Sequence, residues 1–206
     1  MSTDRVSTLQ ANQEGILQAI RTLYLPDGPE ADVTFSTGGI YASGTMPMPR
    51  LKFDLAPALP DVVEADCRRL PVDAESIGSI LYDPPFIVAA GKESRIGQRF
   101  SSLRTIPLLH ELYRDSIREF ARVLQPGGIL VVKIQDTVSG GKQHRGSIVI
   151  WQEALACDLV DEDWLLCPNV SRMVGHNWAR QQHARKTHVH WLIFRKPRAA
   201  RRGRAA

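Results

Sequence analysis

Apolar positions recur with helical spacing in two stretches of this chain, and residues that stop helices follow both. In the first stretch Leu9 and Ile16 share the apolar side, and a Pro- and Gly-rich turn from Pro26 ends it. A Pro-Gly-Gly sequence at 126–128 ends the second stretch. We therefore predict amphipathic helices over residues 6–24 and 106–124, and a further helix over residues 147–159 that begins after the glycine-rich sequence 139–142.

Short apolar runs rich in β-branched residues lie between these stretches and after them, and they have the length of strands. Their nearly continuous apolar character is typical of strands that are buried on both faces of a parallel sheet. The sequence thus predicts an α/β fold whose strands cover residues 31–35, 51–54, 61–66, 79–81, 129–134, 164–167 and 189–194.

The length of 206 residues suits one α/β domain and leaves little room for a second. We predict a single domain over residues 1–196, in which residues 1–30 form the N-terminal helix and a linker. Residues 197–206 carry four arginines among alanine and glycine, and we expect a disordered basic tail. Such a tail either binds phosphates or only aids solubility.

Composition excludes several classes of protein. Hydrophobic residues make up 43% and charged residues 23%, no apolar run approaches the roughly 18 residues of a membrane span, and the N-terminus lacks the apolar centre of a signal peptide. We therefore expect a cytoplasmic protein without a membrane partner. Cys67, Cys157 and Cys167 have no CxxC spacing, which argues against disulfides and a zinc site, and no metal is expected.

The stretch Asp83-Pro84-Pro85-Phe86 carries the clearest chemistry. It follows the predicted strand 79–81, so Asp83 is expected at the carboxyl edge of the sheet, where α/β enzymes bind ligands. The two prolines fix the backbone, and the Asp83 carboxylate with the Pro84 carbonyl forms an acceptor pair beside an aromatic ring. This arrangement suits a planar amino group. The simpler interpretation is a proline-rich turn with a capping aspartate.

This Asp-Pro-Pro-Phe signature resembles the catalytic motif of class I S-adenosylmethionine-dependent methyltransferases that methylate exocyclic amines of nucleobases, of the small bacterial and phage DNA methylase type. The resemblance implies a Rossmann-like fold with a mostly parallel sheet of about seven strands and helices on both faces. It also implies S-adenosyl-L-methionine as cofactor. Asp83, Pro84, Pro85 and Phe86 would then be catalytic, and adenine N6 in DNA would be the methyl acceptor.

The resemblance extends to the predicted cofactor side. Asp32 matches the family's acid in the first strand, Gly38 matches the second glycine of its turn, and Ser36 stands in place of the first. Asp54 would hold the ribose hydroxyls, and Asp66 would meet the adenine amine. The cofactor-binding residues so implied are Asp32, Thr34, Ser36, Gly38, Asp54, Asp66 and Cys67. Each acid alone has the alternative role of capping the next turn or helix.

Basic residues beside the expected crevice are candidates for contacts with nucleic-acid phosphates. DNA is favoured over RNA as the partner, and solvated loops are the alternative interpretation. The candidates are Lys92, Arg95, Arg99, Lys142, Arg185 and Lys186. Lys133 and Asp136 flank the end of strand 129–134, where structural ion pairs or a capping role are expected rather than a role in the site.

Other functions remain open at this point. Cytosine N4 and RNA bases are alternative acceptors, and a catalytically inactive nucleic-acid-binding relative is favoured by the departure at Ser36. A glutamine methylase of proteins is expected to carry Asn at position 83, where this chain has Asp. Neither GxGxxG nor GxxxxGK[ST] occurs, which argues against an NAD enzyme and a P-loop NTPase.

Overall fold

The computed structural model describes residues 5–88, 105–168, 183–184 and 186–198. Seven strands in these ranges form one sheet in the order β3-β2-β1-β4-β5-β9-β8, and β9 runs antiparallel to both of its neighbours. The other pairs that involve β1 to β5 are parallel, which confirms the predicted α/β fold with a mostly parallel sheet. The strands are β1 (Ala31–Asp32), β2 (Leu51–Asp54), β3 (Val63–Glu64), β4 (Ile77–Tyr82), β5 (Leu124–Ile134), β8 (Val160–Pro168) and β9 (His188–Arg195).

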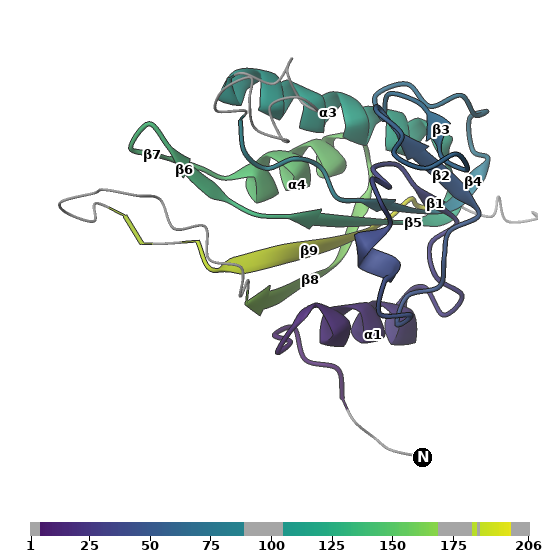
Figure 1. Cartoon of the computed structure of the whole chain (residues 1–206), viewed down its shortest axis with the longest axis horizontal. Helices are drawn as coiled ribbons and strands as arrows, with labels where there is room; N and C mark the ends of the chain where they lie inside the picture. The colour runs from purple at the N-terminus through teal and green to yellow at the C-terminus, as the bar shows by residue number, and fades with distance from the viewer. Residues whose placement is uncertain (1–4, 89–104, 169–182, 185, 199–206) are drawn as a thin grey trace, which may run out of the picture.

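Helices cover both faces of the sheet, as predicted. α3 (Ile106–Val123) and α4 (Gly146–Ala156) lie together on one face, and α1 (Gln13–Leu23) lies on the other, as Figure 1 shows. A short 3₁₀ helix, η1 (Gly39–Tyr41), packs on the same side as α1.

The core has two halves because neighbouring residues of a strand point to opposite faces. Ile80 of β4 packs in the half under α3 and α4, whereas Leu81 packs in the half under α1. Leu130 and Val131 of β5 are divided in the same way. All four side chains are fully buried, which explains why these strands are continuous apolar runs in the sequence.

The predicted start of the first helix was wrong. α1 begins at Gln13, where the Asn12 side chain caps it by accepting a hydrogen bond from the Gly15 amide. The segment before it instead lies along β8, bonded through the backbone on both sides of Leu166. Leu9 forms a bridge with Leu166 and is exposed, so its helical spacing was coincidental.

Three strand predictions also need correction. The predicted strand 61–66 is reduced to Val63–Glu64, and the strand 31–35 to Ala31–Asp32. The Pro-Gly-Gly sequence 126–128 follows α3 but belongs to β5, which begins at Leu124. Backbone bonds of Gly127 and Gly128 with Lys196 keep this segment in the sheet.

A hairpin that was not predicted follows β5. β6 (Thr137–Ser139) and β7 (Lys142–His144) pair antiparallel and form a separate two-stranded sheet. Gly140 and Gly141 connect them with φ of 57° and 71°, the left-handed values that a tight two-residue hairpin turn requires. In Figure 1 the hairpin extends beyond the carboxyl end of β5.

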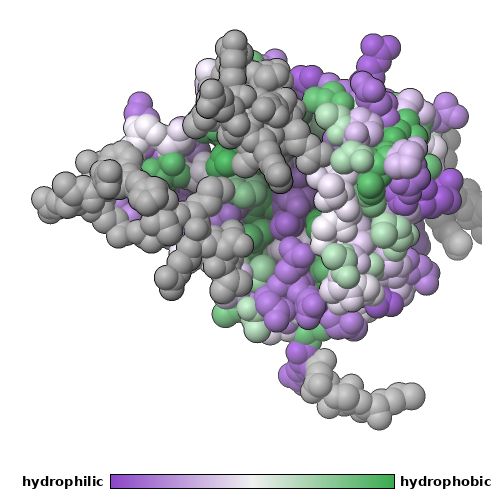
Figure 2. All heavy atoms as spheres, in the orientation of Figure 1, coloured by the Kyte–Doolittle hydropathy of each residue, from purple (hydrophilic) through white to green (hydrophobic). Residues whose placement is uncertain are grey.

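None of the helices in the described ranges is both long and apolar enough to cross a membrane. Hydrophobic residues lie scattered among hydrophilic ones on the coloured part of the face in Figure 2.

Candidate active site at the carboxyl edge of the sheet

Three carboxylates meet at the carboxyl edge of the central strands. Asp32 ends β1, Asp54 ends β2, and Asp83 follows β4. These strands are neighbours, since β1 pairs with both β2 and β4. The negative charges of Asp83 and Asp54 both contribute to raising the pKa of Asp32, so the acids act on one another. The structure therefore brings together three of the acids that the sequence singled out.

Asp32 is the most deeply buried of the three, with 2% of its surface exposed. Its Oδ2 accepts a hydrogen bond of 2.8 Å from the Tyr41 hydroxyl, and its Oδ1 accepts one of 2.9 Å from the Thr34 amide. Burial raises the pKa of Asp32 to about 7, although these two hydrogen bonds favour the ionised form. A nearby cation would stabilise the ionised form of this buried carboxylate.

The turn after β1 is built on left-handed backbone. Gly38 has a φ of 74°, and a Cβ atom there would lie 2.9 Å from the Phe35 ring, so the ring and the backbone approach closely. Ser36 has a φ of 55°, a value that favours glycine, which is the residue that the resembling family carries there. The turn therefore has a left-handed conformation at Ser36 as well as at Gly38.

Asp54 is held by the same turn. Its Oδ2 accepts a 2.7 Å hydrogen bond from the Ser36 amide, and its Oδ1 accepts a 2.9 Å bond from the Ala56 amide. Both oxygens thus cap backbone amides, as the alternative interpretation of these acids expected. Each carboxylate oxygen has a second lone pair, so these bonds leave acceptor capacity for hydroxyls.

The Asp-Pro-Pro-Phe segment is anchored from two sides. The Asp83 amide donates to Thr34 Oγ1 over 2.8 Å, and the Tyr113 hydroxyl of α3 donates to the Pro85 carbonyl over 2.7 Å. In the part of the chain that the structure describes, the Pro84 carbonyl accepts no hydrogen bond. That oxygen and the Asp83 carboxylate are the acceptor pair that the sequence predicted.

The Asp83 side chain forms an ion pair with Lys133 of β5, with 2.8 Å between Lys133 Nζ and Asp83 Oδ2. Burial raises the pKa of Asp83, and the ammonium opposes this effect through its charge and its hydrogen bond. The expected structural ion pair of Lys133 therefore exists, but it involves the candidate catalytic acid itself. Asp136, by contrast, caps the start of α4 by accepting from the Ser147 amide and hydroxyl.

A cavity of about 340 Å³ opens beside this ion pair. Its size lies at the lower end of the range of small-molecule sites. It lies between the end of β4, the ends of β5, β8 and β9, and the start of α1. Its lining residues are Asn12, Gln13, Asp83, Phe86, Lys133, Ile134, Gln135, Cys167, Pro168, Val189 and Trp191.

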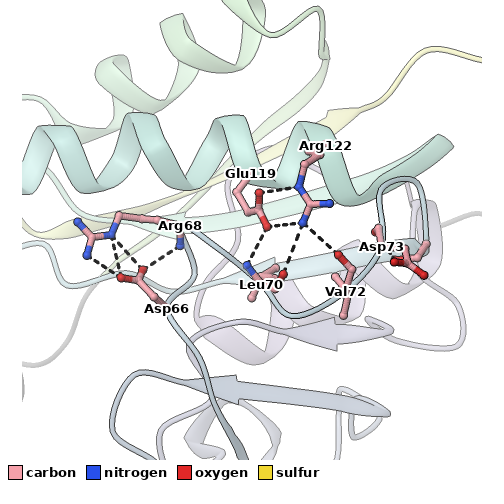
Figure 3. Close-up of polar contacts among 8 residues, drawn as sticks. Asp66, Arg68, Leu70, Val72, Asp73, Glu119 and Arg122 are labelled. Atoms are coloured by element: carbon pink, nitrogen blue, oxygen red, sulfur yellow. Dashed lines mark hydrogen bonds and ion pairs between the residues drawn. The ribbon is translucent and has the colours of Figure 1, made fainter.

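Asp66 and Cys67 are engaged in contacts of their own. The Asp66 carboxylate is bonded on both oxygens by the Arg68 guanidinium, as Figure 3 shows, and this contact holds its pKa below the usual value. Cys67 is buried, its Sγ lies 3.2 Å from Ser116 Oγ of α3, and burial raises its pKa to about 11. The Cys67 thiol thus packs toward α3.

Two of the predicted nucleic-acid contacts can be placed. Lys142 begins β7 of the hairpin, and the Lys186 carbonyl accepts a 2.8 Å hydrogen bond from Gln135 Nε2 at the cavity. His183 bonds the Gly141 carbonyl over 2.7 Å, so the segment before β9 lies beside the hairpin. Lys92, Arg95, Arg99 and Arg185 lie outside the described residues.

Sequence reasoning missed Tyr41, Tyr113 and Trp191. Tyr41 and Tyr113 act through single hydroxyl contacts with residues that lie 9 and 28 positions away, and no local pattern marks such contacts. Trp191 reads as one more apolar residue of a buried strand, and only the pairing of β9 with β5 places it opposite Lys133.

Several solved structures have the same fold. An S-adenosylmethionine-dependent methyltransferase from Methanosarcina mazei has a TM-score of 0.55 and 11% identity, over 87% of this chain and 98% of that one. The [4+2]-cyclase SpnF has a TM-score of 0.57 and 15% identity, over 90% of this chain and 82% of its own. Because their names denote different reactions, the fold alone does not give the chemistry.

A protein described as a DNA modification methylase from Thermus thermophilus, in complex with S-adenosyl-L-methionine, has a TM-score of 0.47 and 16% identity over 68% of this chain. This chain spans only 56% of that protein's length. No protein-family model and no curated protein sequence matches the chain. Its seven-stranded, mostly parallel sheet with helices on both faces is the Rossmann-like fold of class I methyltransferases.

Proposed function

We propose that this protein transfers a methyl group from S-adenosyl-L-methionine to the exocyclic amine of a nucleobase, and that adenine N6 in DNA is the preferred acceptor. The observation that carries the proposal is the position of Asp83. Its carboxylate and the Phe86 ring both line a cavity of about 340 Å³ at the carboxyl edge of the sheet. This edge is where open α/β sheets bind their ligands.

The neighbouring acids fit a cationic cofactor. S-adenosyl-L-methionine carries a sulfonium and an ammonium, and the buried Asp32 carboxylate is destabilised by the charges of Asp54 and Asp83. An ammonium at this place would offset that repulsion. Asp32, Thr34, Ser36 and Gly38 would hold the methionine part, and Asp54 the ribose hydroxyls. Asp66 would exchange the Arg68 guanidinium for the adenine amine, with Cys67 beside it.

The acceptor pair accounts for the activation of the amine. The lone pair of an exocyclic amine is delocalised into the ring, so the nitrogen is a poor nucleophile. If the Asp83 carboxylate and the Pro84 carbonyl each accept one of its hydrogens, they favour a pyramidal nitrogen whose lone pair is exposed. Bound S-adenosyl-L-methionine would supply an electrophilic methyl group and a neutral thioether as the leaving group.

The proposed methyl transfer balances in electrons and protons. The nitrogen lone pair would form the new N–C bond, the electrons of the C–S bond would go to sulfur, and the nitrogen would then lose one proton. Asp83 would accept that proton, because its carboxylate would already receive one of the two hydrogens. Pro85 keeps the segment rigid through its bond with Tyr113.

A base in a duplex cannot present its amine to a cavity of this kind, so it must be flipped out or single-stranded. Phe86 would stack on the base, and such stacking contributes about 1–3 kcal/mol. Lys142 lies on the hairpin that follows β5, Lys186 lies on the segment just before β9, and both would contact phosphates. Lys92, Arg95, Arg99 and Arg185 remain candidates for the same role.

The test combines Asp83→Ala with an assay that identifies the product. Wild-type protein is incubated with tritiated S-adenosyl-L-methionine and unmethylated DNA or RNA, and the polymer is then digested to nucleosides. We expect label in the N6-methylated adenine nucleoside from DNA, loss of transfer in Asp83→Ala, and nearly unchanged cofactor affinity by calorimetry. Asp61→Ala is the control, since Asp61 forms an exposed ion pair with Lys52.

Other outcomes of this test would each correct or reject a different part of the proposal. Label in N4-methylcytosine, or in RNA alone, would correct the acceptor and keep the reaction. Cofactor binding without any labelled nucleoside would reject a nucleobase amine as acceptor. Equal loss of transfer and of cofactor affinity in Asp83→Ala would reassign Asp83 to the cofactor side.

A further inference from the structure

Lys133 occupies an unusual place in the sheet. It lies near the end of β5 among residues 129–134, whose other members are all buried and apolar. It pairs with Trp191 of β9, and its ammonium lies 5.8 Å from the centre of that ring. Among the described residues that line the cavity, Lys133 is the only lysine or arginine. A cation at this place therefore needs an explanation beyond packing.

The contact of Lys133 with Asp83 engages one of the two carboxylate oxygens. Oδ2 accepts the ammonium at 2.8 Å, while Oδ1 accepts no hydrogen bond from the described residues. Only about a quarter of each side chain is exposed, with 20% for Lys133 and 25% for Asp83. A partly buried ion pair is screened less by solvent than a surface pair, so it fixes the carboxylate more firmly.

The other groups around Asp83 make the ammonium more important. Asp32 faces it from β1, and Tyr41 faces it from η1 as a neutral phenol. Among the described residues, Lys133 from β5 is the charged group that favours the ionised form of Asp83. Without this lysine, burial would favour a protonated Asp83, and a protonated carboxyl is a poorer acceptor for an amine.

We propose that Lys133 is the positioning residue of Asp83: it holds Oδ2, so that Oδ1 of an ionised carboxylate is left to accept a hydrogen from the substrate amine. This inference rests on the proposed amino-methyl transfer, but the ion pair itself is measurable without any substrate. Lys133 acts through Asp83 and need not contact the reacting atoms.

The substrate-independent test is a titration. The Asp83 carboxyl carbon is followed by NMR against pH in the wild type, Lys133→Met and Lys133→Arg, with assignment by Asp83→Asn. We expect the midpoint of Asp83 to rise by about 1–3 pH units in Lys133→Met. Lys133→Arg keeps the charge and should keep the midpoint near the wild-type value. An unchanged midpoint in a folded Lys133→Met would overturn the proposal.

The kinetic test is the pH profile of methyl transfer to DNA. In Lys133→Met we expect kcat at pH 7 to fall about 10–100-fold, the acid limb to move to higher pH, and activity to recover partly as pH rises. Cofactor affinity should stay near the wild-type value. Arg50→Met is the matched control, because it breaks an exposed ion pair with Glu30 at the opposite edge of the sheet.

The two tests distinguish a failure of the proposed reaction from a failure of the positioning role of Lys133. If the wild type transfers no methyl group but Lys133→Met still moves the Asp83 titration, the proposed reaction falls and the positioning role stands. If the wild type is active and Lys133→Met changes neither the titration nor the acid limb, the positioning role falls and the reaction stands.

Discussion

The Tyr41 hydroxyl of η1 donates a hydrogen bond of 2.8 Å to the buried Oδ2 of Asp32 at the end of β1. This contact ties the left-handed turn after β1 to the sheet, and the stacking of Tyr41 on Phe35 strengthens the same link. Asp32 nevertheless has a pKa raised to about 7, because burial outweighs both of its hydrogen bonds. Its ionisation is therefore a cost to the folded state at neutral pH.

We predict that this cost appears in the pH dependence of stability. The folded pKa of about 7 lies above the unfolded value, so the folded state binds more protons between them. The contribution of Asp32 to the free energy of unfolding is fully present below about pH 4. It is lost as pH rises through the folded pKa of about 7. Asp32→Asn should remove this loss, which is on the order of several kcal/mol. Urea unfolding of both proteins at pH 5 and pH 8 measures it.

Tyr41→Phe is the companion variant for this measurement. It removes the donor to Asp32, so the pKa of Asp32 should rise further and the loss of stability should extend to higher pH. If the wild type and Asp32→Asn lose stability in parallel between pH 5 and pH 8, the raised pKa of Asp32 is contradicted.

Phe86→Ala should weaken the interaction with nucleic acid rather than the binding of cofactor. Phe86 lines the cavity beside Asp83, and the loss of one stacked base costs about 1–3 kcal/mol. The KM for DNA should rise by the corresponding factor of roughly 5 to 150, and Phe86→Tyr should restore it. A Phe86→Ala protein with unchanged KM for DNA and weaker cofactor binding would place the ring on the cofactor side.

Tyr113→Phe should loosen the Asp-Pro-Pro-Phe segment. The Tyr113 hydroxyl donates to the Pro85 carbonyl over 2.7 Å, and its loss should lower the free energy of unfolding by about 1 kcal/mol. If Asp83 is catalytic as proposed, kcat should fall about 10-fold or more, because transfer would depend on the position of its carboxylate.

Tyr82→Phe is the control for that variant. The Tyr82 hydroxyl is also buried and bonds Ser116 of α3 over 3.2 Å, but its contact is not with the Pro-Pro backbone. A similar loss of stability with unchanged kcat is expected. If both variants lose kcat equally, the effect comes from the packing of α3 and not from the Pro85 contact.

The sequence predicted elements best where burial is continuous. β4, residues 129–134 of β5, and β9 are largely apolar and pack into both halves of the core, so their pattern stands out locally. β3 has only two residues, both exposed, and it exists because its backbone pairs with β2. The backbone pairing of a two-residue strand leaves no period in the sequence.

The candidate site also has parts that the sequence could predict and parts that it could not. Asp83 was found because an acid after an apolar run is a local signal, whereas Asp32 and Asp54 were singled out through the resemblance to amino-methyltransferases; parallel strands bring such ends together. The Lys133–Asp83 pair joins residues 50 positions apart, and only the parallel pairing of β4 and β5 sets them side by side. The sequence could place each residue at the edge, but not the contact between them.

The segment that follows β3, up to Val72, is held against α3 by two side chains of that helix. Glu119 of α3 is buried, and its Oε1 accepts a hydrogen bond of 2.8 Å from the Leu70 amide. Arg122 donates to both oxygens of Glu119 and also to the Val72 carbonyl over 3.1 Å, as Figure 3 shows. One carboxylate and one guanidinium thus fasten the segment to α3.

Glu119→Ala should lower the free energy of unfolding by about 1–3 kcal/mol, because it leaves the buried Leu70 amide without an acceptor. Asp115→Ala is the matched control on the same helix, since its carboxylate is 38% exposed and its bond to Arg118 should contribute less than about 0.5 kcal/mol. Asp66 begins this segment, so Glu119→Ala should also weaken cofactor binding if Asp66 receives the adenine amine. Calorimetry with S-adenosyl-L-methionine at a temperature where the variant is folded decides this: an unchanged affinity would mean that the segment holds the fold together without shaping the cofactor site.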